Sequence, residues 1–108
     1  VFNENECEIV SLDSLTQNEG VGTALVNAVA EEARQLQCQR VFLSTTNDNL
    51  RALGFYQKRG FVLSALHPNA VEEIRKRKPS IPLIGENGIP LRDEIELEMA
   101  LTPDPSPK

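Results

Sequence analysis

Residues 49–61 read Asn-Leu-Arg-Ala-Leu-Gly-Phe-Tyr-Gln-Lys-Arg-Gly-Phe, and this stretch decides the fold. The polar run Asn47-Asp48-Asn49 at its start stops a strand and can cap a helix. The spacing predicts that this helix runs from about Leu50 to Lys58. Gly60 then supplies the left-handed residue that ends the helix, and residues 61–66 form the next strand.

The residues before this stretch predict a strand, a helix and a second strand. Residues 7–13 alternate well enough for a strand, and residues 39–45 predict another. Between them, residues 20–37 carry apolar side chains at three- and four-residue steps, which indicates an amphipathic helix. The glycine-bearing stretch from Leu15 to Gly22 is expected to be the loop that leads into it.

After the deciding stretch, the pattern becomes less regular. A short helix is expected at residues 69–78, followed by a loop rich in Pro and Gly that extends to Leu91. Residues 94–101 alternate strictly between Glu and apolar side chains and predict a last strand. Residues 1–101 are therefore expected to form a single domain, and residues 102–108, which contain three prolines, a flexible tail.

This order of elements predicts an α/β fold (α+β by some schemes), a mixed sheet of about four strands with two main helices. Strands joined through a helix run parallel with right-handed crossovers, so the first three strands are expected to be parallel. The last strand can return antiparallel beside them. The loops after residues 13, 46 and 66 then open at the carboxyl end of the sheet, where α/β sheets bind ligands.

Composition excludes several classes of protein. The 108 residues carry a net charge of −5, which argues against a nucleic-acid-binding stripe. No apolar run approaches the about 18 residues of a membrane span, and no signal peptide opens the chain. Cys7 and Cys38 are too few for a disulfide framework and are expected to be inert packing thiols. A cytoplasmic protein without a metal site is the expectation.

The stretch Gln17-Asn18-Glu19-Gly20-Val21-Gly22 lies between a predicted strand and a predicted helix. Its glycines permit a close approach of the backbone, and the helix start offers N–H groups and a positive dipole end. Together these features can cradle a phosphate. The stretch matches neither a Walker loop nor the dinucleotide fingerprint. Taken alone, such a stretch is more often a plain turn that uses Gly for tightness, because short glycine motifs recur by chance.

Two motifs in the right order carry a family resemblance. Residues 49–61 fit N-x-x-A-x-x-F-Y-x-x-x-G-F, and Gln17-x-x-Gly20-x-Gly22 stands upstream. Together they resemble the GNAT superfamily of acetyl-CoA-dependent N-acetyltransferases, over roughly residues 5–101. The resemblance implies acetyl-CoA as co-substrate and acetyl transfer to a primary amine of a small molecule or peptide. A catalytically incomplete CoA-binding or oligomerising remnant of the family is the alternative.

The resemblance also implies which residues bind acetyl-CoA. The end of the first strand would hydrogen-bond the pantetheine arm like an added strand, and the amides of the following loop would hold the pyrophosphate. Asn49 would face the co-substrate from the mouth of the next helix. The binding residues implied are Leu12, Asp13, Ser14, Leu15, Gln17, Asn18, Glu19, Gly20, Val21, Gly22, Thr23 and Asn49.

By the same resemblance Tyr56 is the general acid. A phenol, whose unperturbed pKa is about 10, can protonate a departing thiolate. The structural alternative for Tyr56 is a half-buried aromatic side chain beside Phe55. The general base stays open among Asp13, Glu94 and His67, each of which is also read as a solvated or structural group. The basic run at residues 75–78 is read as an anion-attracting patch or a solvated helix face.

Members of the family are longer, with strands and helices before the first strand seen here. Val1-Phe2 and the turn at residues 3–6 look like the end of a third strand and its hairpin, so the chain is expected to be truncated. The strand at 7–13 would then present an apolar edge of the kind that recruits another chain. A homo-oligomer, joined through that edge or an uncovered sheet face, is therefore expected. The excursion at residues 67–91 would supply an acceptor-site wall or an interface.

Overall fold

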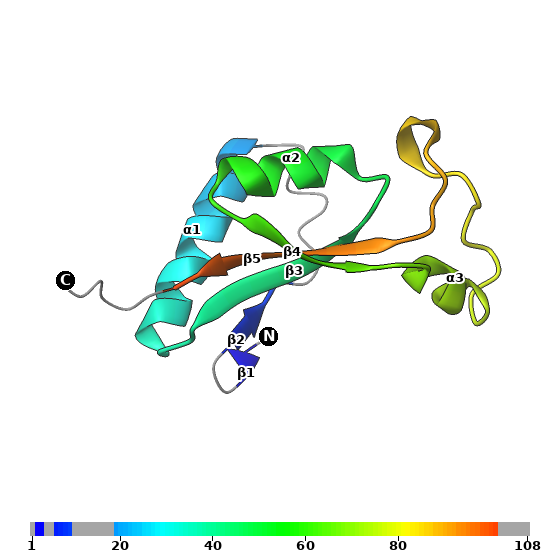
Figure 1. The fold of residues 1–108 in the computed structure, drawn as a ribbon. Coiled ribbons are helices and arrows are strands. Elements are labelled where there is room, and N and C mark those ends of the chain that lie inside the picture. The colour runs from blue at the N-terminus through cyan, green and yellow to red at the C-terminus, as the bar shows by residue number, and fades with distance from the viewer. Residues whose placement is uncertain (1, 4–5, 10–18, 102–108) are drawn as a thin grey trace.

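The structure is a computed structural model that describes residues 2–3, 6–9 and 19–101. Figure 1 shows a mixed sheet with two longer helices packed against it. The strands are β1 (Phe2–Asn3), β2 (Glu6–Glu8), β3 (Arg40–Thr46), β4 (Val62–His67) and β5 (Glu94–Ala100). The helices are α1 (Glu19–Gln35), α2 (Leu50–Lys58) and α3 (Ala70–Arg75), with a short 3₁₀ turn, η2, at Glu86–Gly88.

Within the described residues the strand order is β1-β2-β3-β5-β4. β2 and β3 run parallel, and β5 is antiparallel to both of its neighbours, β3 and β4. The mixed α/β sheet is thus confirmed, with β1 added to the four expected strands. β4 runs in the same direction as β3 but is not beside it, because β5 inserts between them.

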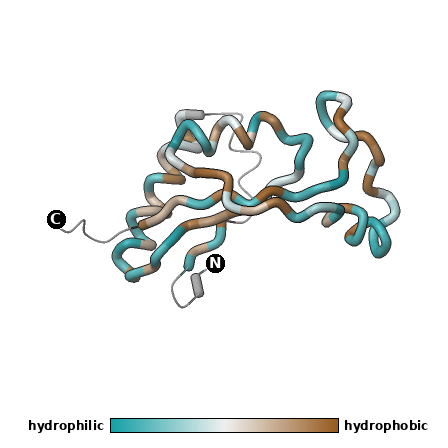
Figure 2. Tube along the Cα trace, in the orientation of Figure 1, coloured by the Kyte–Doolittle hydropathy of each residue, from teal (hydrophilic) through white to brown (hydrophobic). Residues whose placement is uncertain are grey.

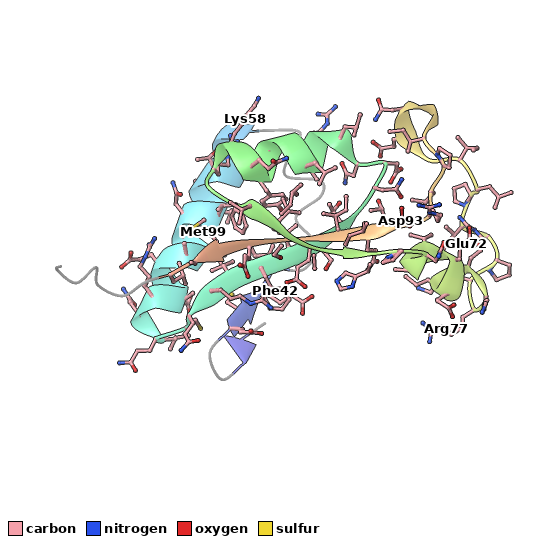
Figure 3. All side chains as sticks on the ribbon, in the orientation of Figure 1. Phe42, Lys58, Glu72, Arg77, Asp93 and Met99 are labelled. Carbon is pink, nitrogen blue, oxygen red and sulfur yellow. The ribbon has the colours of Figure 1, made fainter. Side chains whose placement is uncertain are left out.

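The core lies on one face of this sheet. Val41, Leu43 and Thr45 alternate as buried residues along β3, whereas Phe42 and Ser44 point the other way. α1 and α2 bury their apolar residues against that one face, and Leu97 at the centre of β5 is fully buried. Figure 2 shows the alternation of apolar and hydrophilic residues along these elements, and Figure 3 shows Phe42 on the side away from the helices.

α2 has the bounds that the sequence predicts. The side chain of Asn49 accepts a hydrogen bond from the Ala52 amide at 3.1 Å, which caps the start of the helix. Gly60 adopts φ +100° just after the end of α2, a conformation that a side chain would strain. The signal for the start of this helix and the signal for its end were therefore both read correctly.

α1 starts earlier and ends earlier than expected. Gly20 and Gly22, where the expected loop and the expected helix overlap, lie in the first turn of the helix, which begins at Glu19. At the other end Gln37 adopts φ +63°, and the Cys38 amide bonds back to the Ala33 carbonyl at 2.9 Å. Gln37 thus ends the helix in the left-handed conformation, although it is not a glycine.

Residues 68–93, here called the arm, leave the sheet after β4 and return to it at β5 (Figure 1). The guanidinium of Arg75 organises the arm by donating to the carbonyl oxygens of Ile81, Pro82 and Leu91. Residues 83–91 fold into a small hairpin, closed by the Leu91 amide bonding to the Leu83 carbonyl. The expected loop is therefore an ordered excursion, because the half-buried Arg75 satisfies three of its backbone carbonyls.

No helix among the described residues is long and apolar enough to cross a membrane. Cys7 and Cys38 are buried free thiols on the core side of the sheet. Burial raises the pKa of the Cys7 thiol, which disfavours its reactive thiolate form.

Candidate active site

The described pairing between the parallel strands β2 and β3 runs from Glu6 to Ile9. Their register runs from Glu6 opposite Arg40 to Glu8 opposite Phe42, and the Ile9 amide adds one bond to the Phe42 carbonyl at 2.8 Å. β3 continues to Thr46, paired there with β5. Among the described residues, nothing pairs with the β2 side of β3 beyond Phe42.

Several residues that the resemblance assigns to the site fall outside the described part of the chain. The expected pantetheine-binding strand end and the first residues of the expected phosphate loop lie in the stretch 10–18, and so does the candidate base Asp13. The residues concerned are Leu12, Asp13, Ser14, Leu15, Gln17 and Asn18.

The remaining residues of the expected phosphate loop form the start of α1. Glu19, Gly20 and Val21 make the first turn, whose amides an α-helix does not bond internally. Gly22 is buried, while Gly20 is exposed at the helix start. The positive end of the dipole of this seventeen-residue helix therefore lies at the two glycines.

Arg59 connects this helix start to the end of α2, a role that the sequence reading missed. Its Nε donates to the Thr23 hydroxyl at 2.8 Å, and its Nη1 donates to the Phe55 carbonyl at 2.9 Å. The guanidinium carbon lies 3.8 Å from the centre of the Phe55 ring. Residue 59 immediately precedes the helix-ending glycine, and no sequence signal at that position indicates a contact 36 residues away.

Asn49 and Tyr56 both lie on α2, at its cap and on its buried face. The Asn49 side-chain oxygen is engaged in the cap described above. Tyr56 is 2 % exposed, and its ring packs edge-on against Phe55 at 5.0 Å and Phe61 at 5.3 Å between centroids. The tyrosine is thus held in one orientation by two aromatic neighbours, and is more deeply buried than the half-buried alternative assumed.

Two of the candidate bases are brought together by strand register. His67 at the end of β4 lies opposite Glu94 at the start of β5, and Glu94 also lies opposite Thr46. The His67 Nε2 is 3.8 Å from a carboxylate oxygen of Glu96. His67 and Glu94 therefore both lie at the edge of the sheet where β3 and β4 end, as the sequence predicted.

The four residues of the basic run at 75–78 do not point the same way. Arg75 turns inward to the carbonyls of the arm, whereas Lys76, Arg77 and Lys78 are exposed. Lys76 makes an exposed ion pair with Glu73 at 3.4 Å.

The face of the sheet opposite the helices is strongly charged. Arg40 makes ion pairs with Glu6 at 3.0 Å and with Glu96 and Glu98 at 2.7 Å, and it lies over the Phe42 ring. The hydrogen bonds from Arg40, with a smaller one from Ser64, hold the pKa of Glu96 below its ordinary value. In the ranges that the structure covers, no group of three or more His, Cys, Asp or Glu is placed to hold a metal ion.

A cavity of about 330 Å³ lies at the opposite end of the sheet, lined by Arg34, Gln37, Cys38, Gln39 and Leu101. These residues stand before β3 and after β5, far along the strands from the start of α1 and from His67. The cavity is therefore separate from the candidate site.

Comparison with known proteins identifies the family. The model of the acetyltransferase (GNAT) family matches residues 2–61, more than half of the chain. The chain therefore belongs to the GNAT acetyltransferase family.

Two proteins of Bacillus subtilis (strain 168), both described as uncharacterized, are similar in sequence. YdhI is 57% identical over 90 residues, which cover 83% of this chain and 56% of YdhI. YxbD is 53% identical over 97 residues, which cover 90% of this chain and 61% of YxbD. The chain thus spans less than two thirds of the length of these relatives.

Solved structures agree with the family. A Bacillus subtilis acetyltransferase in complex with CoA matches with a TM-score of 0.73 and 31% identity, covering 94% of this chain and 64% of that one. A GNAT family acetyltransferase from Elizabethkingia anophelis with acetyl-CoA bound matches with the same TM-score, the same coverage and 28% identity. An IAA acetyltransferase from Bacillus cereus ATCC 14579 matches with TM-score 0.73 and 27% identity, covering 94% and 65%.

Proposed function

We propose that the protein binds acetyl-CoA and transfers its acetyl group to a primary amine of a small molecule or peptide. The observation that carries the proposal is the arrangement of β2, α1 and β3, in which a helix with Gly20 and Gly22 in its first turn connects two parallel neighbouring strands. Membership of the GNAT family and the CoA-bound relatives support the choice of ligand.

The residues at hand fit a pyrophosphate and a pantetheine arm. Gly20 and Gly22 lack side chains at the helix start, so an anion can approach the backbone there. We assign the pyrophosphate to residues 17–23 and the pantetheine arm to residues 12–15, with Asn49 at the mouth of α2.

In the proposed reaction the amine nitrogen attacks the thioester carbonyl carbon, a C–N bond forms and the C–S bond breaks. The departing CoA sulfur takes a proton from the Tyr56 hydroxyl, and the amine gives up a proton to a base. His67 and Glu94, which face each other across β4 and β5, are the candidates for that base among the described residues. The proton balance then closes when the base returns a proton to Tyr56 through solvent.

The test is titration calorimetry with acetyl-CoA, followed by turnover of an amine panel with the wild type and Tyr56→Phe. Phe preserves the packing against Phe55 and Phe61, so we expect acetyl-CoA affinity within about threefold of wild type. Turnover should fall by about 100-fold or more, the range of general acid catalysis. No binding at millimolar acetyl-CoA would refute the proposal, and unchanged turnover would remove Tyr56 from it.

A second candidate function is CoA binding without transfer. The chain covers 56% and 61% of its two curated relatives, so a longer protein has further residues that could complete an acceptor site. Tight acetyl-CoA binding without acetylation of any amine in a broad panel would favour this second candidate.

We also propose a homo-oligomer formed through the sheet. In the described residues β1 pairs with Glu6 and Cys7 of β2, and the helices α1 and α2 pack on the other side of the sheet from Arg40 and Phe42. Light scattering during gel filtration should give a mass of at least twice 12.0 kDa, and a clean 12.0 kDa monomer at micromolar concentration would contradict this. The free thiols Cys7 and Cys38 suit a cytoplasmic location.

A further inference from the structure

β4 is the last strand of the described sheet, and only one of its sides is paired. The order β1-β2-β3-β5-β4 places β5 on one side of β4, and no other described segment bonds to the main chain of Val62–His67. The other side therefore presents a row of N–H and C=O groups to its surroundings. An edge of this kind is a template onto which a further strand can pair.

The sequence of β4 contains few of the features that keep strand edges apart. Soluble proteins protect such edges with charged side chains, with proline or with a covering segment. Residues 62–66 read Val-Leu-Ser-Ala-Leu, without charge or proline, although 25% of the chain is charged. The exception is an irregularity in the ladder between Leu63 and Ala65, which leaves Ser64 as an extra residue, as in a β-bulge.

This irregularity brings two leucines to the same face of the strand. Leu63 lies opposite Leu97, and Leu66 lies opposite Ile95, and both β5 residues belong to the core or pack against it. Because opposite side chains share a face, Leu63 and Leu66 both point to the side of the helices. They are nevertheless 54% and 60% exposed, so the helices leave the outer margin of this face uncovered.

The order of residues along β4 is complementary to itself. In the ladder with β5, Ala65 stands between Leu63 and Leu66. If a second copy pairs antiparallel about a twofold axis at Ala65, Leu63 of each copy lies opposite Leu66 of the other and Ala65 lies opposite its own equivalent. A twofold interface requires this reciprocity. The same register sets Val62 opposite His67, so no like-charged pair arises in chains that each carry a net charge of −5.

We propose that two copies of this chain pair through their β4 edges and form one continuous sheet. The proposal rests on the homo-oligomer proposed above and names its interface as the edge opposite to β1 and β2. β4 runs in the direction of β3, so Leu66 and the start of α2 at Leu50 lie at the same end of the sheet.

The exposed apolar area sets the strength of this dimer. Leu50, Val62, Leu63 and Leu66 are each at least half exposed, and together they offer roughly 150–250 Å² of apolar surface per copy. A standard stable interface buries about 800 Å² per partner. The main chain and polar atoms of the paired strands must supply the rest, so we expect a dissociation constant in the micromolar range.

The first experiment is sedimentation of the wild type, Leu66→Lys and Leu36→Lys from about 1 µM to about 1 mM. The wild type should move from 12.0 kDa to twice that mass as concentration rises. Leu66→Lys places a charge at the edge of both copies, and we expect the dissociation constant to rise by about tenfold or more. Leu36→Lys makes the same change at a 53% exposed leucine beyond α1 and should stay within about twofold of wild type.

A second experiment locates the axis by oxidation. Opposite residues of an antiparallel pair have Cα atoms about 4.5–5.5 Å apart, within the range of a disulfide. With diamide as the oxidant, Ala65→Cys should therefore give a covalent dimer on a non-reducing gel. Ser80→Cys, exposed on the arm, is the matched control and should remain monomeric on that gel. The buried Cys7 and Cys38 are present in both variants.

Urea unfolding of each variant shows that folded proteins are compared, and the Ala65→Cys result stands alone where Leu66→Lys does not fold. A wild type that stays at 12.0 kDa throughout contradicts both the homo-oligomer and this interface. A wild-type dimer that Leu66→Lys leaves unchanged, or that Leu36→Lys weakens equally, overturns the β4 interface alone. Absence of the Ala65→Cys cross-link does the same. Acetyl-CoA titration of the same samples reports separately on the proposed enzymatic function.

Discussion

At the scale of single residues, Arg40 ties three strands together on the face of the sheet that the helices leave open. Its partners are Glu6 on β2 and Glu96 and Glu98 on β5, all within 3.0 Å. These bonds raise the pKa of Arg40 and lower that of Glu96. The Glu residues that alternate along β5 are therefore more than solvated charges, because one of them is held in its ionised form.

This predicts how stability depends on pH. The pKa of Glu96 is lower in the folded protein than in the unfolded chain, so the carboxylate stabilises the fold above its ordinary pKa of about 4.3. That contribution should fade as the pH falls from this value through the lowered pKa. Urea unfolding followed between pH 6 and pH 2 should show the loss, and Glu96→Gln should show a shallower slope. An equal slope in both proteins would contradict the prediction.

At the scale of elements, α2 is a short helix with a defined beginning and end. The Asn49 cap and the left-handed Gly60 bracket nine residues, of which Ala52, Phe55 and Tyr56 are buried. A helix of this length is not stable alone, so its caps and its packing must hold it together. The placement of Tyr56 thus depends on a cap seven residues earlier.

The cap gives a prediction that separates structure from binding at Asn49. Asn49→Ala should lower the free energy of unfolding by about 1 kcal/mol, because the Ala52 amide loses its acceptor. Asn49→Asp keeps an acceptor and should stay close to wild type in thermal unfolding. The acetyl-CoA affinity of the two variants then shows whether the side-chain amide of Asn49 contributes to binding apart from its role as a cap. Equal stability of the Ala variant and wild type would show that the cap contributes nothing.

At the scale of the whole molecule, the protein consists of a sheet with its core on one face and of the ordered arm at residues 68–93. Asn47, directly after β3, connects the sheet to the arm, since its side chain donates to the Pro90 carbonyl and accepts from the amides of Arg92 and Asp93. Asp48 adds a buried acceptor for the Glu86 amide, in a space that a Cβ at Gly85 would fill. The turn after β3 therefore positions both α2 and the arm at the candidate site.

Removing the hydrogen bonds of the Asn47 side chain should make the arm open more often without unfolding the sheet. In Asn47→Ala, amide hydrogen exchange should become faster across residues 83–93, because three hydrogen bonds are lost there. Amides at the centre of β3 and β5, around Leu43 and Leu97, should keep the protection of the wild type. Asn27→Ala on the exposed side of α1 is the matched control. Uniformly faster exchange would mean that the arm and the sheet open as one unit.

Local signals in the sequence were sufficient for the elements. Helix caps, glycine at a left-handed position and the two hydrophobic periods act over a few residues, so α2, β3 and β5 could be placed within a residue or two. The paired motifs indicated the family for the same reason, since each motif is a local run of residues. The start of α1 was likewise placed within one residue, and its end within two.

The tertiary structure alone decided which distant residues meet. The insertion of β5 between β3 and β4, the bond from Arg59 to Thr23 and the anchoring of the arm by Asn47 all join residues 27 or more positions apart. Such contacts depend on how helices and strands pack as whole bodies, and the local preferences of neither partner encode them. The sequence by itself determined the parts and their chemistry, while packing determined which of those parts lie side by side.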